Sequence, residues 1–260
     1  MDPIEGTNLR VTDVLKYLLY FVIYLIVKML KINVFIRLFY NRIVLFVVPF
    51  SYLFICRFGD CHTVLSAFSR RYYDLINPYR GMVVIDIGAH IGTFAIRYGK
   101  KLRSSGIVIA IEPEPSNYEL LKLNLRLNKL YNVYALPIAC SSYTGKTVLY
   151  LHGFTGHSLV YRSDRYVYVQ QYTLDDLYRA LSRVLKVRKI DLIKINAEGA
   201  EVNILLGAQQ ALIYTRALVI AAHHDPDQPA LVSKILESKG FHCRIIYRKG
   251  NTLVLAISKA

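Results

Sequence analysis

In Val83-Val84-Ile85-Asp86-Ile87-Gly88-Ala89-His90-Ile91-Gly92-Thr93, a short β-branched run leads directly into a glycine-containing turn. Such a run is typical of a strand that is buried on both faces of a parallel sheet. Gly88 and Gly92 bracket the turn, and the residues that follow continue at helical spacing. A turn of this kind lets the backbone approach a ligand closely and points the N–H groups of a helix at it. The stretch therefore predicts a ligand site at the carboxyl edge of a parallel sheet.

The spacing of the glycines distinguishes between the common nucleotide-binding turns. The dinucleotide fingerprint GxGxxG and the P-loop GxxxxGK[ST] each need residues that this turn lacks. Ile107 to Glu112 is a second buried-strand run, and Glu112 stands 24 positions after Gly88. An acid at that place can hold the two hydroxyls of a ribose. The combined pattern is typical of S-adenosylmethionine (SAM) binding in Rossmann-like methyltransferases.

SAM is therefore the cofactor that the sequence predicts. Asp86, at the end of the first strand, can accept hydrogen bonds from a cationic or hydroxylic group of the ligand. The predicted SAM-binding residues are Asp86, Gly88, Ala89, His90, Gly92, Glu112 and Asn196.

Charge and cysteine content narrow the class of protein. The formal net charge of +15 favours anionic partners, but the cations are dispersed and form no block typical of a nucleic-acid-binding arm. The four cysteines form no CxxC pair and no cluster with histidine. Free thiols in a reducing cytosol are the simplest interpretation, and no metal site is predicted.

The first 57 residues differ in composition from the rest of the chain. Residues 14–27 and 43–56 are nearly all apolar, and basic residues alternate with large apolar ones between them, as in an interfacial helix that faces anionic lipid. Neither block reaches the ~18 uninterrupted apolar residues of a clear membrane span. We predict a hydrophobic helical segment over 1–57 that associates with a membrane through 14–56 and leaves the catalytic domain in the cytoplasm. The alternative is a helical subdomain that packs onto the core or into a homodimer of a cytoplasmic protein.

Alternating strand and helix patterns follow a helical lead-in at 58–81. They predict a Rossmann-like α/β domain over 82–260, with a mostly parallel seven-stranded sheet and a C-terminal β-hairpin. Residues 141–171 break the alternation and are predicted to form an inserted hairpin above the sheet. The expected strands are 82–87, 106–112, 132–138, 190–195 and 217–222, the hairpin strands are 241–247 and 252–258, and the expected helices are 62–76, 92–103, 115–129 and 228–239, with one more starting at Thr173.

The block Ile190 to Glu201, IDLIKINAEGAE, resembles the FkbM family of SAM-dependent methyltransferases. The IDIGAHIG turn and the TLDD segment at 173–176 support this resemblance, which covers about residues 80–245. It implies a Rossmann-like fold that transfers methyl from SAM to a hydroxyl of a sugar, lipid or secondary metabolite. The chain departs from the family pattern at Asn196, where the family usually has Asp. It departs again at Ala221 and Ala222, where the family commonly has an acid.

Methyl transfer to a hydroxyl requires alignment of the acceptor and removal of its proton. In a parallel sheet such a site lies in the loops at the carboxyl ends of the strands. Histidine has the right pKa for a general base near neutral pH. We predict His223 or His224 as the base, with Glu198 orienting SAM or the acceptor and Asn196 beside them.

The predicted function is O-methylation of a glycan, lipid-linked or secondary-metabolite hydroxyl. A nucleic-acid methyltransferase is the first alternative, which the net charge of +15 would suit. The strand at 190–195 does not end in the NPPY-type tetrad that holds an exocyclic base amine, so nucleic acid is not the expected partner. A SAM-binding scaffold without turnover is the second alternative, suggested by Asn196.

Overall fold

The computed structural model describes residues 36–40, 43–48, 52–57, 60–69, 71–153, 156–248 and 251–259. The chain divides into two compact units, residues 1–61 and 62–260. In the first unit, an antiparallel three-stranded sheet is formed by β1 (Ile36–Tyr40), β2 (Ile43–Val48) and β3 (Tyr52–Arg57).

Strands rather than helices occupy the described part of the N-terminal region, so the prediction of a helical segment through residue 57 is wrong there. The segments are rich in Ile, Val, Phe and Tyr, whose branched or aromatic side chains favour the pleated surface of a sheet. A short apolar run is compatible with either structure, and the prediction followed hydrophobicity alone. Residues 1–35 lie outside the described residues, as does the predicted membrane segment within them. In the part of the chain that the structure describes, no helix is long and apolar enough to cross a membrane.

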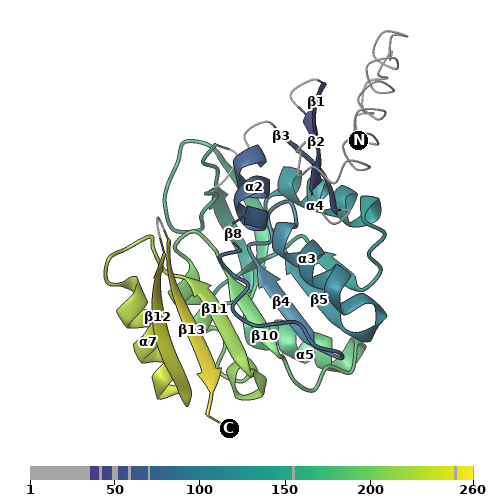
Figure 1. Cartoon of the computed structure of the whole chain (residues 1–260). Coiled ribbons are helices and arrows are strands. Elements are labelled where there is room, and N and C mark those ends of the chain that lie inside the picture. Colours follow the sequence, from purple (N-terminus) through teal and green to yellow (C-terminus); the bar gives the residue numbers. More distant parts are fainter. Residues whose placement is uncertain are drawn as a thin grey trace, which may run out of the picture. The chain divides into compact units, whose positions relative to one another are not determined.

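The second unit contains the predicted Rossmann-like sheet of seven strands, in the order β12-β13-β11-β10-β4-β5-β6 (Figure 1). All the strands from β11 to β6 in this order run parallel, and β13 pairs antiparallel with both β11 and β12. The mostly parallel sheet with a C-terminal hairpin is thus confirmed. The strands are β4 (Val83–Ile87), β5 (Ile107–Ile111), β6 (Val133–Leu136), β10 (Leu192–Ile195), β11 (Ala217–Ala221), β12 (Phe241–Arg248) and β13 (Asn251–Ser258).

The helices follow the strands as the sequence predicts, although α2 ends at Ser69, well before the predicted end at residue 76. Thr173 caps the predicted helix start, because its Oγ1 accepts the N–H of Asp176 at 3.0 Å. Glu114 caps α4 in the same way. The helices are α2 (Cys61–Ser69), α3 (Thr93–Leu102), α4 (Pro115–Leu127), α5 (Leu174–Val184), α6 (Glu201–Leu206) and α7 (Gln228–Ser238), with 3-10 turns η2 (Arg103–Ser105) and η3 (Ala211–Tyr214).

The predicted insertion is a separate three-stranded sheet of order β7-β9-β8. Its strands are β7 (Ala139–Cys140), β8 (Gly145–Tyr150) and β9 (Tyr166–Tyr172). β8 and β9 form the expected antiparallel hairpin, and β7 runs parallel to β9. Ala139, Leu149 and Val169 make a small apolar cluster on one face of this sheet.

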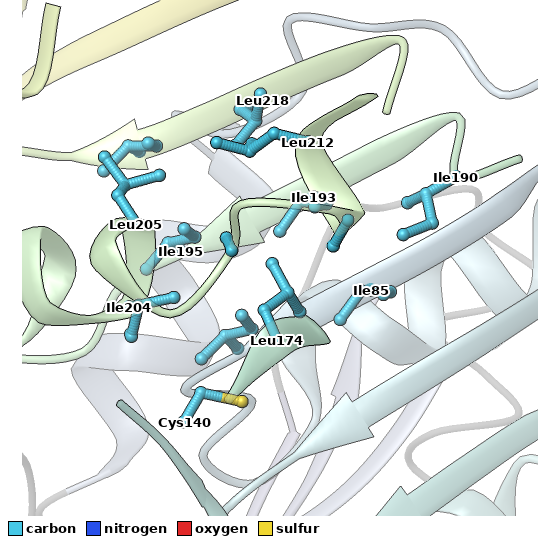
Figure 2. Close-up of a cluster of buried hydrophobic side chains, with 14 of the residues drawn as sticks. Ile85, Cys140, Leu174, Ile190, Ile193, Ile195, Ile204, Leu205, Leu212 and Leu218 are labelled. Carbon is cyan, nitrogen blue, oxygen red and sulfur yellow. The ribbon is translucent and has the colours of Figure 1, made fainter. Parts of the chain in front are cut away.

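The main core lies between one face of the large sheet and the helices α5, α6 and α7 (Figure 2). Alternate residues of the central strands point into it, among them Ile85, Ile193 and Ile195. All four residues of β10 are buried, as expected of a strand covered on both faces. The one ionisable residue in β10 is Lys194, and it faces the opposite side of the sheet from this core.

Replacement of Ile193 by alanine tests this assignment of the core. Ile193 has no exposed surface, so Ile193→Ala should leave a cavity and lower the free energy of unfolding by about 2–5 kcal/mol. Ile213→Ala is the matched control, because Ile213 is 75 % exposed and its truncation should change stability by no more than about 0.5 kcal/mol. Urea unfolding followed by circular dichroism measures both, and equal losses would contradict the proposed core.

Candidate active site

The glycine turn after β4 is held against the end of β5. Both Gly88 and Ala89 donate their backbone N–H groups to the carbonyl of Ile111, at 3.0 and 2.9 Å. Gly88 has a φ of 73°, in the left-handed region that favours glycine. His90 has a φ of 53° without being glycine, and such backbone conformations persist only where the surroundings impose them. The turn is therefore a rigid part of the sheet edge.

Gly88 is required for a second reason, the close approach of the loop after β10. A Cβ atom at Gly88 would lie 1.9 Å from the carbonyl oxygen of Asn196. Asn196 donates its own N–H to the carbonyl of Ile87 at 3.0 Å. The two predicted cofactor-binding segments are thus in direct backbone contact.

Glu112 lies at the end of β5 with only 5 % of its surface exposed. Its Oε2 accepts the N–H of His90 at 2.7 Å, and its Oε1 accepts the N–H of Glu114 at 3.1 Å and the side-chain amide of Asn117 at 3.3 Å. Burial raises the pKa of Glu112 above its ordinary value, against the opposing effects of His90 and of these N–H groups. The carboxylate is therefore fixed in place, and its position links the two parts of the predicted SAM site.

A buried ion pair lies beneath the turn. Lys194 Nζ is 2.9 Å from Asp86 Oδ1 and donates to the carbonyl of Gly88 at 2.8 Å. Both side chains are almost completely buried, at 4 % and 0 % exposed respectively. Tyr73 covers the ammonium group, with its ring centre 5.3 Å from Nζ. Burial and then the negative charges of Glu198 and Asp86 raise the pKa of Tyr73, so its hydroxyl stays protonated at neutral pH.

The loop after β10 is organised around the carboxylate of Glu201, which has no exposed surface. Oε1 accepts the N–H of Ala197 at 2.8 Å, and Oε2 accepts the N–H of Gly199 at 3.0 Å and the side-chain amide of Gln228 at 2.7 Å. Glu198, inside this loop, has a φ of 50°. Glu201 therefore fixes the loop, while Glu198 at its tip stays partly exposed.

The two predicted base candidates occupy different positions. His224 lies between two carboxylates, with Nδ1 3.8 Å from Glu198 Oε2 and Nε2 3.8 Å from Glu201 Oε1. His223 stacks near it, at 4.3 Å between ring centres, and lines the central cavity. Burial, and next the neighbouring His224, lower the pKa of His223 below its ordinary value, against the opposing charge of Glu198.

The inserted sheet is tied to both of these loops. Ser158, which has no exposed surface, donates its hydroxyl to the carbonyl of Glu198 at 2.6 Å. Tyr161 donates its hydroxyl to the carbonyl of His224 at 3.3 Å. Its ring also covers Gly199, where an added Cβ would lie 2.6 Å from the ring. The insertion therefore forms a wall of the site.

These elements enclose a cavity of about 280 Å³ at the carboxyl edge of the sheet. Cys140 also lines it, and burial raises the pKa of that thiol to about 12. Within the described residues, no group of three or more His, Cys, Asp or Glu is arranged to hold a metal ion. The predicted residues that line the cavity are Gly88, His90, Glu112, Asn196, Glu198 and His223.

The remaining predicted residues lie outside the cavity wall. Asp86 is buried below the turn with Lys194, and His224 is behind His223. Ala89 lies in the turn and borders a smaller neighbouring cavity, and Gly92 begins α3. Sequence reasoning missed the structural partners of the site, namely Tyr73, Ser158, Tyr161, Lys194 and Gln228. A signal was present only for Lys194, which is a cation inside an otherwise apolar strand.

Comparison with known proteins supports this site. Residues 86–243 match the sequence profile of the methyltransferase FkbM domain. Methyltransferase sdnD of Sordaria araneosa is 29 % identical over 205 residues, which are 67 % of this chain and 79 % of that protein. Methyltransferase 1 of Beauveria bassiana (strain ARSEF 2860) is 23 % identical over 180 residues, covering 61 % of this chain and 71 % of that protein.

A solved structure agrees in fold. The crystal structure of methyltransferase FkbM from Methylobacillus flagellatus KT superposes with a TM-score of 0.51 at 17 % sequence identity. The match covers 76 % of this chain and 53 % of that one, so this chain spans about half the length of the solved protein. At this identity the similarity concerns the fold alone.

The contact between the two loops can be tested at Gly88. Gly88→Ala should destabilise the protein, because alanine disfavours a φ of 73° and its Cβ would overlap the carbonyl of Asn196. Gly240→Ala is the control: its φ is 85°, but no atom lies within 4 Å of the added Cβ. We expect about 1–2 kcal/mol of destabilisation for the control. Gly88→Ala should lose about 1–3 kcal/mol more, measured by urea unfolding. Equal losses would show that the loops separate freely.

Proposed function

The chain belongs to the FkbM methyltransferase family and is a SAM-dependent methyltransferase, and we propose that it methylates a hydroxyl oxygen of its acceptor. The observation that carries this proposal is the meeting of Glu112, Asn196 and His223 on one cavity. They come from the ends of three strands of the parallel sheet, where α/β enzymes bind their ligands. Each supplies a function that the reaction needs, as argued below.

The residues of the cavity suit SAM. Gly88 leaves space beside Asn196 that any side chain would fill, and Glu112 offers a fixed carboxylate for ribose hydroxyls. Asn196 Oδ1 is buried and accepts no hydrogen bond from the described residues, so it is available to a ligand donor. When bound, SAM supplies a methyl group already activated by a sulfonium sulfur. In this proposal Gly88, His90, Glu112 and Asn196 hold the cofactor, and Asp86 acts indirectly by fixing Lys194 under the turn.

His223 is the general base in this proposal, and His224 is a positioning residue. A base must be neutral to accept a proton, and burial favours the neutral form of His223. It also lines the cavity, whereas His224 is enclosed by Glu198, Glu201 and Tyr161. His224 thereby holds the loop that carries His223.

The acceptor enters between the catalytic loops and the insertion. Gly156, His157 and Leu159 of the insertion line the cavity opposite His223 and Glu198. Their position favours a small hydroxyl-bearing group, from a glycan, a lipid-linked molecule or a secondary metabolite. Membrane association through 14–56, a homodimer and a cytoplasmic location of the catalytic domain stay predictions, since they depend on residues or partners outside the described structure.

Cofactor binding can be measured without knowledge of the acceptor. Calorimetric titration of the full-length, detergent-solubilised protein should detect SAM and not NAD. Glu112→Ala should weaken SAM binding about 10- to 100-fold, because a charged hydrogen-bonding group contributes about 1.5–3 kcal/mol. Glu119→Ala should leave the affinity unchanged, since the Glu119 side chain is 68 % exposed on the same helix-and-strand unit. Folded protein that does not bind SAM would refute the placement of the cofactor.

The pKa of His223 provides an independent test of its role. Because the pKa of His223 is lowered from its ordinary 6.5, the side chain should stay neutral at pH 7. Methyl transfer should then be constant above about pH 6.5 and fall as the pH drops through the lowered pKa. NMR titration of the histidine ring carbons gives the pKa directly, with His223→Gln identifying the signal. The same variant should reduce turnover by about 10²–10⁴-fold with unchanged SAM affinity. A loss of SAM affinity would instead make His223 a binding residue.

A further inference from the structure

The outer face of the inserted hairpin presents an aromatic surface. In the antiparallel register, Tyr150 is opposite Tyr166, Val148 opposite Tyr168, and Lys146 opposite Gln170. Directly opposed residues of a sheet point to the same side. We call this set the tyrosine face; it consists of Lys146, Val148 and Tyr150 of β8 and Tyr166, Tyr168 and Gln170 of β9.

The tyrosine face is open to solvent although it is largely aromatic. Tyr168 is 72 % exposed and Tyr166 is 53 % exposed. The two rings contact each other edge to face, with 5.8 Å between their centres. Exposed tyrosines gathered on one face of a sheet are uncommon without a binding role, because each ring leaves apolar surface in water.

The composition of the face selects a class of ligand. Three of its six residues are tyrosines, which combine an apolar ring with a hydroxyl, and Gln170 adds an amide. Lys146 is its single cation, and it contains no carboxylate. Nucleic acid requires a path of several cations beside the aromatic rings, and a membrane-binding face would be rich in Leu, Ile, Phe or Trp. A neutral ligand with apolar ring faces and many hydroxyls complements this surface, and a sugar chain has that chemistry.

The tyrosine face is continuous with the wall of the active site. Tyr150, at its end, exchanges backbone hydrogen bonds with Ser158 at 2.9 and 3.0 Å. His157 and Leu159, on either side of Ser158, line the cavity. Leu149 lines the same cavity from the inner face of β8. A chain lying along the tyrosine face therefore ends beside the cavity.

We propose that the tyrosine face binds a neutral oligosaccharide and that the acceptor hydroxyl belongs to this sugar chain. The inference rests on the proposed O-methyl transfer, whose acceptor it assigns to glycans. Tyr166 and Tyr168 stack against sugar rings, while Gln170 and the tyrosine hydroxyls bond to sugar hydroxyls. The neighbouring residue enters the cavity, where His223 removes its proton.

The test is saturation-transfer NMR on the full-length protein with SAM present. The probes are the neutral hexasaccharides of cellulose, chitin and mannan. At least one should bind, and Tyr168→Ala should weaken its binding about fivefold or more. Tyr168→Phe keeps the ring and should retain most of the affinity. Tyr131→Ala is the control, because Tyr131 is a tyrosine 88 % exposed on another part of the domain and its loss should change nothing.

The outcomes separate the two proposals. SAM affinity should be equal in wild type and in all three variants, so that its absence from wild type would count against the proposed function and not against the tyrosine face. Normal SAM binding with no binding of any hexasaccharide would overturn the glycan assignment. Sugar binding that Tyr168→Ala leaves intact would also overturn it. Binding of oligouridylate or of phosphatidylglycerol vesicles that depends on Tyr168, with no sugar binding, would assign the face to that ligand instead.

Discussion

The ion pair between Asp86 and Lys194 joins the two central strands at the point where the site begins. These residues are register partners in the parallel pairing of β4 and β10. A slip by one residue would leave both charges buried without a partner, at a cost of several kcal/mol for each ion. The ammonium also bonds to the carbonyl of Gly88. The same interaction therefore sets the strand register and holds the glycine turn, and the contact between Gly88 and Asn196 depends on both.

The second organising feature is the use of carboxylates as internal supports. Glu112 accepts backbone N–H groups at the end of β5, and Glu201 does the same after β10. Backbone groups in buried loops need partners, and a carboxylate can satisfy several of them with strong hydrogen bonds. Because these acids hold the loops, the cavity is shaped before any ligand arrives. Preorganisation of this kind reduces the ordering that binding or reaction would otherwise require.

Local sequence patterns predicted most of the sheet, because fully buried parallel strands are runs of Ile and Val and their helices begin at recognisable caps such as Thr173. They failed in the described N-terminal strands, where the same apolar residues are compatible with helix or strand. The site was predicted only to the extent that its residues follow strand ends. Ser158 meets Glu198 across 40 positions and Tyr161 meets His224 across 63, and no local pattern encodes contacts at such separations. The choice between His223 and His224 likewise depends on which ring faces the cavity.

The position of β13 in the sheet has a consequence for the order of events during protein synthesis. β13 pairs with β11, and Ala222 at the start of the histidine loop donates its N–H to Thr252. The earlier strands can associate as the nascent chain leaves the ribosome, but β11 remains an unpaired edge until β13 has been translated. Residues 223 and 224 are therefore anchored on that side last. Ribosome-bound chains that stop before β13 carry the glycine turn complete and the catalytic loop unfinished, so the enzyme is assembled cofactor side first.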